Sequence, residues 1–524
     1  MNEVNKLNNK KSNNSLNTVV KGTAIVFIGT IMGMLFAFIG RVLFARFFTP
    51  EQYGIFSLSV TILSVFTAIG TIGLQQGTTR QIAYYLGKGK NIETAFVIRW
   101  SLVFALPSGI VISTLIFILS DIIALNFFHM PGLILPLKLF SLAIPFFIFI
   151  QILSSTFRGF KKVKEKVYFV DFARNFLFPV FLIPVIILSL SFIWGLIVYV
   201  LSIVLTSVLF FIYYLRKKPT KKNFKTKSFN VKVGKELILF SLPLLLVMVM
   251  YQIMSWTDTI MLGFYKNSEI VGLYNTARPL GGFISTALTA MLFTYTPVVS
   301  ELYAQQKNKE MKRDYAVLTK WVCSGTLPLV LIFVLFPETV INFLFGSDYI
   351  LAATALQILS IGYFFNNLMG PNGATLTAFG KTRFLMYATA AAAIINIIMN
   401  AILIPIYGLN GAAIATIISL IAVNAIRSVK LYKLSKVHSL GKKIFKPIIL
   451  SIVLILIIYF LTKNYLVVKI WMLPIIFILF IFLYFASLLL THSIDEEDVS
   501  LLIDIENKTG LKLKRIKNIL RKFI

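Results

Sequence analysis

The sequence is poor in the residues from which metal sites and disulfide frameworks are built. Its 524 residues include one cysteine and three histidines, too few for either kind of site. Only 14% of the residues are charged, against about one quarter in soluble domains, while 58% are hydrophobic. Acidic residues are the scarcest charged group, with 20 Asp and Glu against 51 Lys and Arg. These proportions exclude a soluble globular enzyme.

The sequence motifs of catalysis are missing as well. No Gly-rich phosphate loop followed by Lys and Ser or Thr occurs, so the chain does not hydrolyse ATP by itself. A membrane glycosyltransferase would need acidic residues in an outer loop, but the first outer turn offers only Glu51. We therefore expect a protein that is not an enzyme and that has no bound cofactor or metal.

Long apolar runs are what the sequence has in abundance. About 20 mostly apolar residues cross a bilayer as a helix, and about fourteen such runs recur along the chain. The first run lacks a small-residue cleavage pattern, so it is expected to remain as the first helix. We predict an all-α polytopic membrane protein with spans at 20–46, 54–77, 93–119, 134–157, 168–188, 192–215, 237–264, 270–302, 315–336, 351–370, 383–405, 411–434, 445–462 and 468–490.

The basic residues are distributed unevenly between the two sides of these spans. If the N-terminus is inside, the inner segments hold 41 of the 51 basic residues and the outer ends hold six. Because short cytoplasmic loops retain basic residues, both termini are predicted to be cytoplasmic, in a multi-pass protein of the cell membrane. The formal charge of +31 then reflects topology, and nucleic acid is not an expected partner.

A basic inner break at 216–235 divides the predicted spans into six and eight, as a linker between two lobes would. In the last segment, apolar residues at helical spacing face basic ones, which suits a helix on an anionic inner leaflet and equally a solvated helix. The predicted parts are a cytoplasmic polar tail (1–19), an N-lobe with helices one to six (20–215), the linker, a C-lobe with helices seven to twelve (236–434), helices thirteen and fourteen (435–491) and a cytoplasmic amphipathic tail (492–524).

An internal repeat relates the two lobes. The segment FFTPEQYGIFSL (47–58) resembles FYKNSEIVGLYNT (264–276) and aligns Gly54 with Gly272 at an offset of 218 residues. Because this offset spans an even number of helices, the repeats run in the same direction about an axis along the membrane normal. Two parallel lobes of this kind enclose a central cleft, and rocking them exposes it to each side in turn. The repeat therefore predicts a transporter.

Two stretches resemble a known family. Residues 46–83, which begin RFFTPEQYGIF, and IINIIMNAILIPIYGLNGAAIATIIS (394–419) are similar to the Wzx-type polysaccharide flippases of the multidrug/oligosaccharidyl-lipid/polysaccharide exporter superfamily. The resemblance implies two six-helix lobes plus two C-terminal helices, and movement of a lipid-linked oligosaccharide from the inner to the outer leaflet. That lipid and the membrane lipids are then the expected partners, with glycan-assembly enzymes as further candidates.

A phosphate-bearing substrate needs cationic groups within the membrane, where charges are costly and are candidates for function. Arg278 would lie roughly 12 Å deep in its span, given the rise per residue of a helix. Its guanidinium could hold a phosphate bidentately, or it could pair with a carboxylate or carbonyl. Arg41, near the outer end of the first helix, is a second candidate, although it could simply snorkel to the interface.

Uncharged amides suit sugar hydroxyls, because each amide offers donors and an acceptor. Gln75 and Gln76 lie with Arg80 at the inner end of the second span, and Asn366 and Asn367 precede a Gly-Pro-Asn-Gly break in the second lobe. We predict all five as substrate-binding residues. For the two asparagines, however, the favoured role is to bond backbone groups freed where a helix breaks.

Three charged residues are predicted to act in coupling or gating. Asp171 and Arg174, at positions i and i+3, can pair on one helix face, and a structural role is the favoured reading of that pair. Asp258 lies one position from the repeat equivalent of Arg41, so those two could form a lock between the lobes. Na+ or H+ moving with the substrate would make and break such carboxylate contacts, and the sequence leaves open whether transport is coupled.

Two other functions remain as alternatives. A cation-coupled drug or metabolite antiporter of the same superfamily would share the fold, but the first lobe has few acidic residues for its cation sites. A membrane glycan polymerase or ligase is disfavoured by the absence of acidic outer loops.

Overall fold

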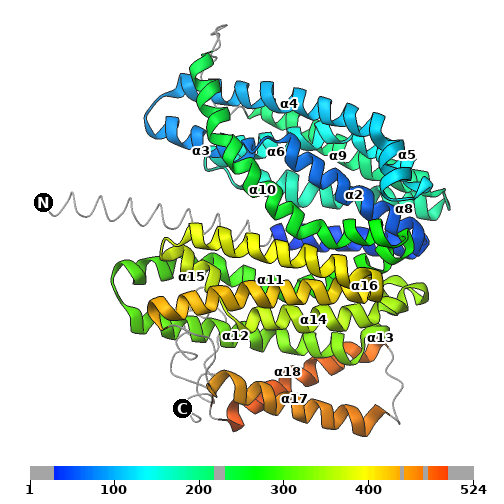
Figure 1. Ribbon diagram of the computed structural model, residues 1–524, viewed down its shortest axis with the longest axis vertical. Helices are drawn as coiled ribbons and strands as arrows, with labels where there is room; N and C mark the ends of the chain where they lie inside the picture. The colour runs from blue at the N-terminus through cyan, green and yellow to red at the C-terminus, as the bar shows by residue number, and fades with distance from the viewer. Residues whose placement is uncertain (1–28, 218–229, 437–441, 464–469, 492, 494–524) are drawn as a thin grey trace, which may run out of the picture. The chain divides into compact units, whose positions relative to one another are not determined.

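The computed structural model describes residues 29–217, 230–436, 442–463, 470–491 and 493, which form helices and turns without any strand (Figure 1). The predicted all-α membrane fold is confirmed. Ten described helices are long and apolar enough to cross a membrane, or up to twelve if each of two bent pairs is one span. Each predicted span overlaps a described helix, and the count of fourteen stays a prediction. The polar tail, most of the basic linker and nearly all of the amphipathic tail lie outside the described residues.

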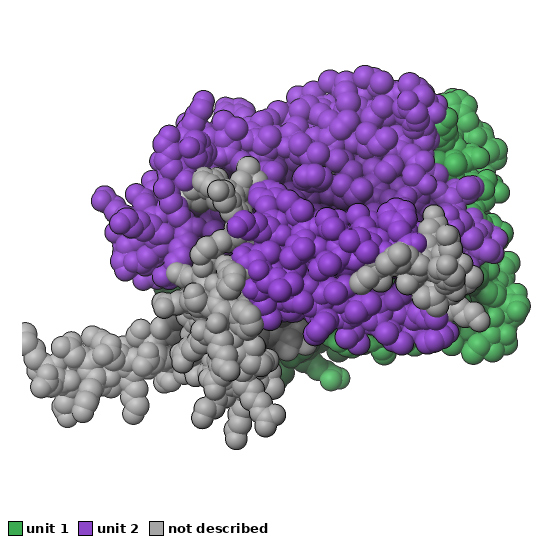
Figure 2. Space-filling model, turned by 90° about the horizontal axis from the view of Figure 1, so that it is seen from below, with its two compact units in different colours: residues 1–272 green, residues 273–524 purple. Residues whose placement is uncertain are grey.

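Residues 1–272 form one of two compact units (Figure 2). Helix α10 packs against α2, α3 and α4, which places it with this unit by its contacts, and the predicted lobe boundary at 216–235 stays a prediction. The main helices are Gly29–Phe47, α2 (Pro50–Gly70), α3 (Leu74–Gly87), α4 (Asn91–Ile122), α5 (Ile134–Ser141), α6 (Ile144–Gly159), α8 (Arg174–Ile187), α9 (Phe192–Arg216) and α10 (Val231–Tyr265).

Residues 273–524 form the second unit, in which α14 packs against α12 and α16, and α18 against α12 and α17. The 54-residue helix α16 is broken at Gly408, whose φ is 55°, between the two spans predicted there. Helix α11 begins in the last residues of the first unit. The helices are α11 (Ser268–Ala304), α12 (Asn308–Leu335), α13 (Pro337–Phe345), α14 (Ala353–Leu368), α15 (Asn372–Ala378), α16 (Thr382–Ser435), α17 (Lys442–Lys463) and α18 (Leu473–Leu490).

The two repeated segments begin their helices in the same way. Thr49 caps α2 in a capping box: its Oγ1 accepts from the Gln52 N–H at 3.3 Å, and its own N–H donates to Gln52 Oε1 at 3.2 Å. Asn267, which follows Thr49 by 218 residues, caps α11 by accepting the Ile270 N–H at 3.0 Å. Equivalent caps at the repeat offset support the internal repeat.

The repeat-related glycines Gly54 and Gly272 lie against each other's helix backbone. A Cβ on Gly54 would overlap the carbonyl of Ser268, and a Cβ on Gly272 would overlap the carbonyl oxygen of Pro50. Pro50 and Ser268 are themselves 218 residues apart, so the two contacts are reciprocal. Only glycine lets the two helix backbones approach so closely.

Aromatic packing holds the helices around the start of α2. Phe44 and Phe56 stack with ring centroids 4.2 Å apart, and Phe56 stacks on Phe178 of α8 at 5.8 Å. Tyr199 of α9 contacts Phe178 edge to face at 5.0 Å. Aromatic pairs of this kind add to the free energy gained by burial. The resulting cluster fixes the N-terminal half of α2 relative to α8 and α9.

A buried lysine joins α12 to the end of α18 in the second unit. Lys320, 5% exposed, donates from Nζ to the carbonyl of Ser493 at 3.0 Å. One turn along α12, the Ser324 hydroxyl donates to the Tyr484 hydroxyl at 3.0 Å. A buried ammonium needs such an acceptor, because a buried charge without a partner is costly.

Candidate functional site

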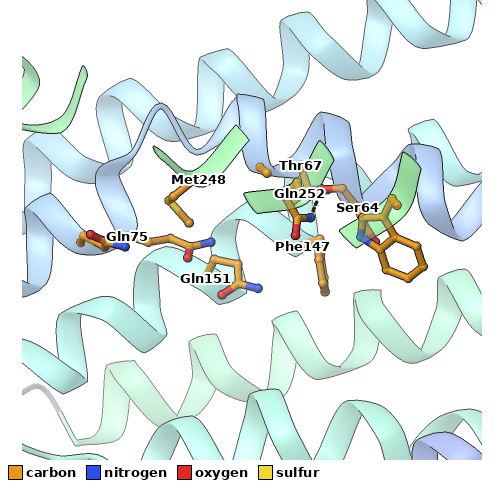
Figure 3. Close-up of a pocket in the computed structure, with 10 residues that line it drawn as sticks. Ser64, Thr67, Gln75, Phe147, Gln151, Met248 and Gln252 are labelled. Carbon is orange, nitrogen blue, oxygen red and sulfur yellow. Dashed lines mark hydrogen bonds between the residues drawn. The ribbon is translucent and has the colours of Figure 1, made fainter. Parts of the chain in front are cut away.

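A cavity of about 500 Å³ lies within the first unit, between α2, α3, α6 and α10 (Figure 3). Pockets of this size are typical of small-ligand sites. None of the residues that line it is charged, and four carry amide side chains. The lining residues are Ser64, Thr67, Ala68, Gln75, Gln76, Phe147, Gln151, Met248, Gln252 and Trp256.

A break between α2 and α3 places the first two glutamines at this cavity. Helix α2 ends at Gly70, and α3 begins at Leu74 after Gly73, which has a φ of 68°. A Cβ on Gly73 would also overlap the carbonyl oxygen of Ser241 on α10. A side chain here would therefore be both strained and obstructed. The glycine allows Gln75 and Gln76 to follow the break directly at the cavity wall.

The amide groups differ in how far they are already bonded. Gln252 donates from Nε2 to the carbonyl of Ser64 at 3.3 Å, which fixes it against α2. Within the described part of the chain, the side-chain amides of Gln75, Gln76 and Gln151 make no hydrogen bond. Each can offer donors and an acceptor to a ligand. Together with the aromatic rings in the wall, these amides suit a polyhydroxylated ligand such as a sugar.

Two cations stand directly behind the cavity wall. The Arg158 guanidinium donates to the Ser155 hydroxyl at 3.1 Å and to the carbonyl of Gln75 at 3.5 Å. The Arg174 guanidinium lies 5.0 Å from the ring centroid of Phe147, in a cation–π contact. The cavity is therefore lined by neutral groups, with two cations behind its wall.

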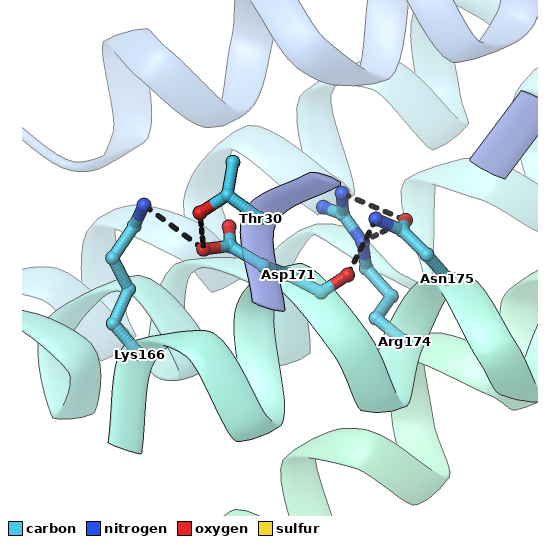
Figure 4. A network of polar contacts seen from close by, with 5 residues as sticks. All are labelled: Thr30, Lys166, Asp171, Arg174 and Asn175. Carbon is cyan, nitrogen blue, oxygen red and sulfur yellow. Dashed lines mark hydrogen bonds and ion pairs between the residues drawn. The ribbon is translucent and has the colours of Figure 1, made fainter. Parts of the chain in front are cut away.

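Asp171 and Arg174 do not form the pair that their spacing predicts (Figure 4). Asp171 accepts from Lys166 Nζ at 3.2 Å and from the Thr30 hydroxyl at 3.1 Å, while Arg174 donates to Asn175 Oδ1. The reason is local geometry: Val167–Ala173 is a π-helix, whose wider turn moves positions i and i+3 off a common face. The coupling role predicted for these residues stays a prediction.

We expect Asp171→Asn to lower the free energy of unfolding by about 1–2 kcal/mol, because it removes the charge that a partly buried lysine pairs with. Thermal unfolding of the purified protein would measure the change. The matched control is Asp121→Asn, whose partner Lys138 lies 3.0 Å away but whose side chain is 52% exposed, so it should change little. Equal shifts in the two variants would contradict this expectation. Unchanged transport by Asp171→Asn would reject its coupling role.

The other predicted cations are not among the residues that line this cavity. Arg80 is exposed, and its guanidinium lies 4.2 Å from the ring centroid of Phe240. Arg41 is close enough to Tyr53 and Tyr199 to interact electrostatically with both. Arg278 is half-buried on α11. Their predicted contacts with substrate stay predictions, as does the lock between Arg41 and the buried Asp258.

The two asparagines of the second unit bond within the protein. Asn367 is fully buried and donates from Nδ2 to the carbonyl of Ile284 at 2.9 Å. Asn366 Oδ1 accepts from Asn424 Nδ2 at 2.9 Å, and Asn424 in turn accepts from Asn372 at 3.0 Å. These bonds favour the structural role that the break in the helix suggests for both residues.

Several residues that line the cavity are not predicted as site residues from the sequence. Gln151 and Gln252 stand singly within apolar spans, and Thr67, Phe147 and Trp256 are residue types common in any membrane helix. Charge marks none of these five residues, whereas an isolated glutamine within an apolar run marks the first two. Among the described residues, no group of three His, Cys, Asp or Glu could hold a metal ion.

The sequence matches two family profiles. The profile described as polysaccharide biosynthesis protein matches residues 19–303, more than half of the chain, and the MatE profile matches residues 243–402. A candidate O-antigen transporter of Shigella flexneri is 24% identical over 416 residues, covering 76% of this chain and 94% of that protein. A probable low-salt glycan biosynthesis flippase of Haloferax volcanii is 27% identical over 169 residues, 31% of this chain and 34% of that protein.

Solved structures share the fold at low sequence identity. The lipid II flippase MurJ, in an inward closed conformation, has a TM-score of 0.67 and 17% identity, covering 91% of this chain and 99% of that one. An inward-facing multidrug transporter of the MATE family has a TM-score of 0.65 and 16% identity, covering 79% and 99%. At these identities the likeness establishes the polytopic fold alone.

Proposed function

The chain belongs to the polysaccharide biosynthesis protein family, and from that premise we propose that it is a flippase for a polyprenyl-linked oligosaccharide. It would move this lipid from the inner to the outer leaflet by alternating access, for the synthesis of a surface glycan. The resemblance to polysaccharide flippases is confirmed by the family match and by relatives named as a glycan flippase and an O-antigen transporter.

The amide-lined cavity of the first unit is the observation that supports this function best. A glycan presents many hydroxyls and few charges, and Gln75, Gln76 and Gln151 offer unbonded amides to such groups. Trp256 and Phe147 add aromatic surface, and apolar sugar faces can pack on such rings. An antiporter for cationic drugs would instead need a carboxylate in its cavity, and none lines this one.

The second candidate function is cation-coupled export of a drug or metabolite. The MatE match over residues 243–402 and relatives named as probable multidrug resistance proteins favour it. The shorter extent of that match, and the neutral lining of the cavity, favour the flippase. Drug efflux from cells that express the chain, without any glycolipid translocation, would reverse this order.

We place the multi-pass chain in the cytoplasmic membrane with both termini in the cytoplasm, as the distribution of basic residues predicts. Glycan-assembly enzymes would deliver and receive the substrate. The chain would act without a cofactor, and Na+ or H+ is the candidate coupling ion.

Reconstitution tests the proposed function directly. Fluorescent polyprenyl-diphosphate oligosaccharide in proteoliposomes would be assayed for exposure in each leaflet over time, with protein-free vesicles as the control. We expect translocation only with the protein present. Folded protein that translocates none of several glycolipids would refute the proposal.

Arg278→Ala is expected to reduce this translocation at least tenfold, because the sequence predicts that its guanidinium holds the phosphate of the substrate. Arg278→Lys should recover only part of the rate, because an ammonium cannot bind bidentately. An exposed cation elsewhere, Arg216, serves as the control for loss of charge. Equal rates for wild type and Arg278→Ala would leave the flippase function standing and remove Arg278 from the site.

A further inference from the structure

The break between α2 and α3 starts a helix at the cavity. Helix α3 is 14 residues long, and its N-cap, Gly73, makes no side-chain capping bond. The N–H groups in the first turn of a helix have no acceptor within that helix. Two of them belong to Gln75 and Gln76, which line the cavity. These two backbone donors therefore belong to residues of the cavity wall and lie at the positive end of a helix dipole.

A buried hydroxyl without a partner lies beside this break. On α2, Ser59, Thr61 and Ser64 each donate to the carbonyl four residues earlier. Thr67 lines the cavity and is only 3% exposed, yet its Oγ1 has no hydrogen-bond partner. A buried hydroxyl left unbonded lowers stability. An oxygen of a ligand in the cavity would supply the missing acceptor.

The electrostatic surroundings favour a ligand oxygen that carries negative charge. Arg158 contacts the carbonyl of Gln75 from behind the wall, and Arg174 lies over Phe147. The Nε of Arg158 is itself buried without a partner. No acidic side chain lines the cavity, so no carboxylate there would repel a negatively charged ligand oxygen. Asp171 lies outside the lining, near enough to Arg158 to interact with it electrostatically. Helix N-termini bind carboxylates and phosphates for the same electrostatic reason.

We propose that this corner of the cavity is a subsite for an anionic oxygen group of the transported glycolipid, held by the Thr67 hydroxyl and the N–H groups of Gln75 and Gln76. The proposal rests on the proposed flippase function and specifies the chemistry its cavity selects. Two groups of a glycolipid share that chemistry: the carboxylate of a uronic acid within the glycan, and a phosphate of the carrier lipid.

The test compares Thr67→Val with wild type on two glycolipids that differ in one group. Both carry the same polyprenyl diphosphate and oligosaccharide, and one has a uronic acid in place of a neutral hexose. Valine keeps the shape of threonine and removes the hydroxyl. The matched control is Thr61→Val on the same helix, whose hydroxyl donates to the Ser57 carbonyl at 2.8 Å and which does not line the cavity.

Two readouts are measured on the full-length chain. Dissociation constants for both glycolipids come from protein in lipid nanodiscs, and translocation rates come from proteoliposomes. Thermal unfolding of each variant confirms that it is folded. We expect Thr67→Val to weaken binding of the uronic acid glycolipid about tenfold, with binding of the neutral one unchanged and Thr61→Val like wild type. That result assigns the subsite to the carboxylate.

The other outcomes separate this proposal from the proposed function. An equal loss of affinity for both glycolipids assigns the subsite to the phosphate and also supports it. Wild-type affinity of Thr67→Val for both, or no binding of either by folded wild type, overturns the subsite. If Thr67→Val leaves the translocation rate unchanged, the flippase function stands. If the expected difference in binding is found but wild type translocates neither glycolipid, the subsite stands and the flippase function is rejected.

Discussion

Replacing Gly54 by alanine is expected to destabilise the folded chain by about 3 kcal/mol, a large effect for one methyl group. The added Cβ would overlap the carbonyl of Ser268, which is helix backbone and cannot rotate away as a side chain could. This overlap can be relieved only if the two helices separate along their contact. Gly272→Ala should have a similar effect, because its Cβ would overlap the Pro50 carbonyl oxygen.

Thermal unfolding of the two variants, with the yield of folded protein, measures the effect. Gly325→Ala is the matched control, because Gly325 lies within α12 and a Cβ there meets nothing within 4 Å. This control should be stabilised by about 0.5–1 kcal/mol through helix propensity. The effects of Gly54→Ala and Gly272→Ala should combine less than additively, since both open one contact. A Gly54→Ala protein that unfolds like wild type would contradict the described helix crossing.

Removing two cavity amides together, Gln75→Leu with Gln151→Leu, is expected to reduce translocation about 100-fold while the protein stays folded. Each substitution leaves a sugar hydroxyl without a partner when the substrate is bound, at a cost of about 1–3 kcal/mol. About 1.4 kcal/mol corresponds to a tenfold change in rate, so two such losses multiply. The single variants should each show about a tenfold loss.

Gln305→Leu controls for the change from glutamine to leucine itself. Gln305 is exposed beyond the end of α11 and bonds to Glu301 at 3.1 Å, outside the cavity. The translocation rate of Gln305→Leu should equal that of wild type. All of these variants should keep nearly the thermal stability of wild type. If the double variant translocates within twofold of wild type, the cavity amides do not contact the substrate.

The helices could largely be predicted from sequence, because apolar runs of about 20 residues leave few alternatives in a bilayer. The break between α2 and α3 could not be predicted from the sequence. Residues 71–73 fall inside the predicted span 54–77, and the sequence has 29 glycines, of which few mark a break. What distinguishes Gly73 is the carbonyl of Ser241 beside it, a tertiary contact that no local pattern reports.

The site was predicted in part. The gathering of polar residues predicts Gln75 and Gln76 as site residues, and both line the cavity. Gln151 and Gln252 come from separate helices, so only folding brings them to the same space. The pairing expected for Asp171 and Arg174 was wrong because it assumed an α-helix, whereas the chain forms a π-helix over Val167–Ala173. A change of helix type leaves no clear mark in a sequence this apolar.

The reciprocal contact of Gly54 and Gly272 makes the two positions depend on each other. When equivalent positions of two repeats touch each other, the contact has the self-complementary form of an interface between two identical subunits. Each glycine then forms part of the surface against which the other packs. A substitution at either position therefore disturbs the surface that both share.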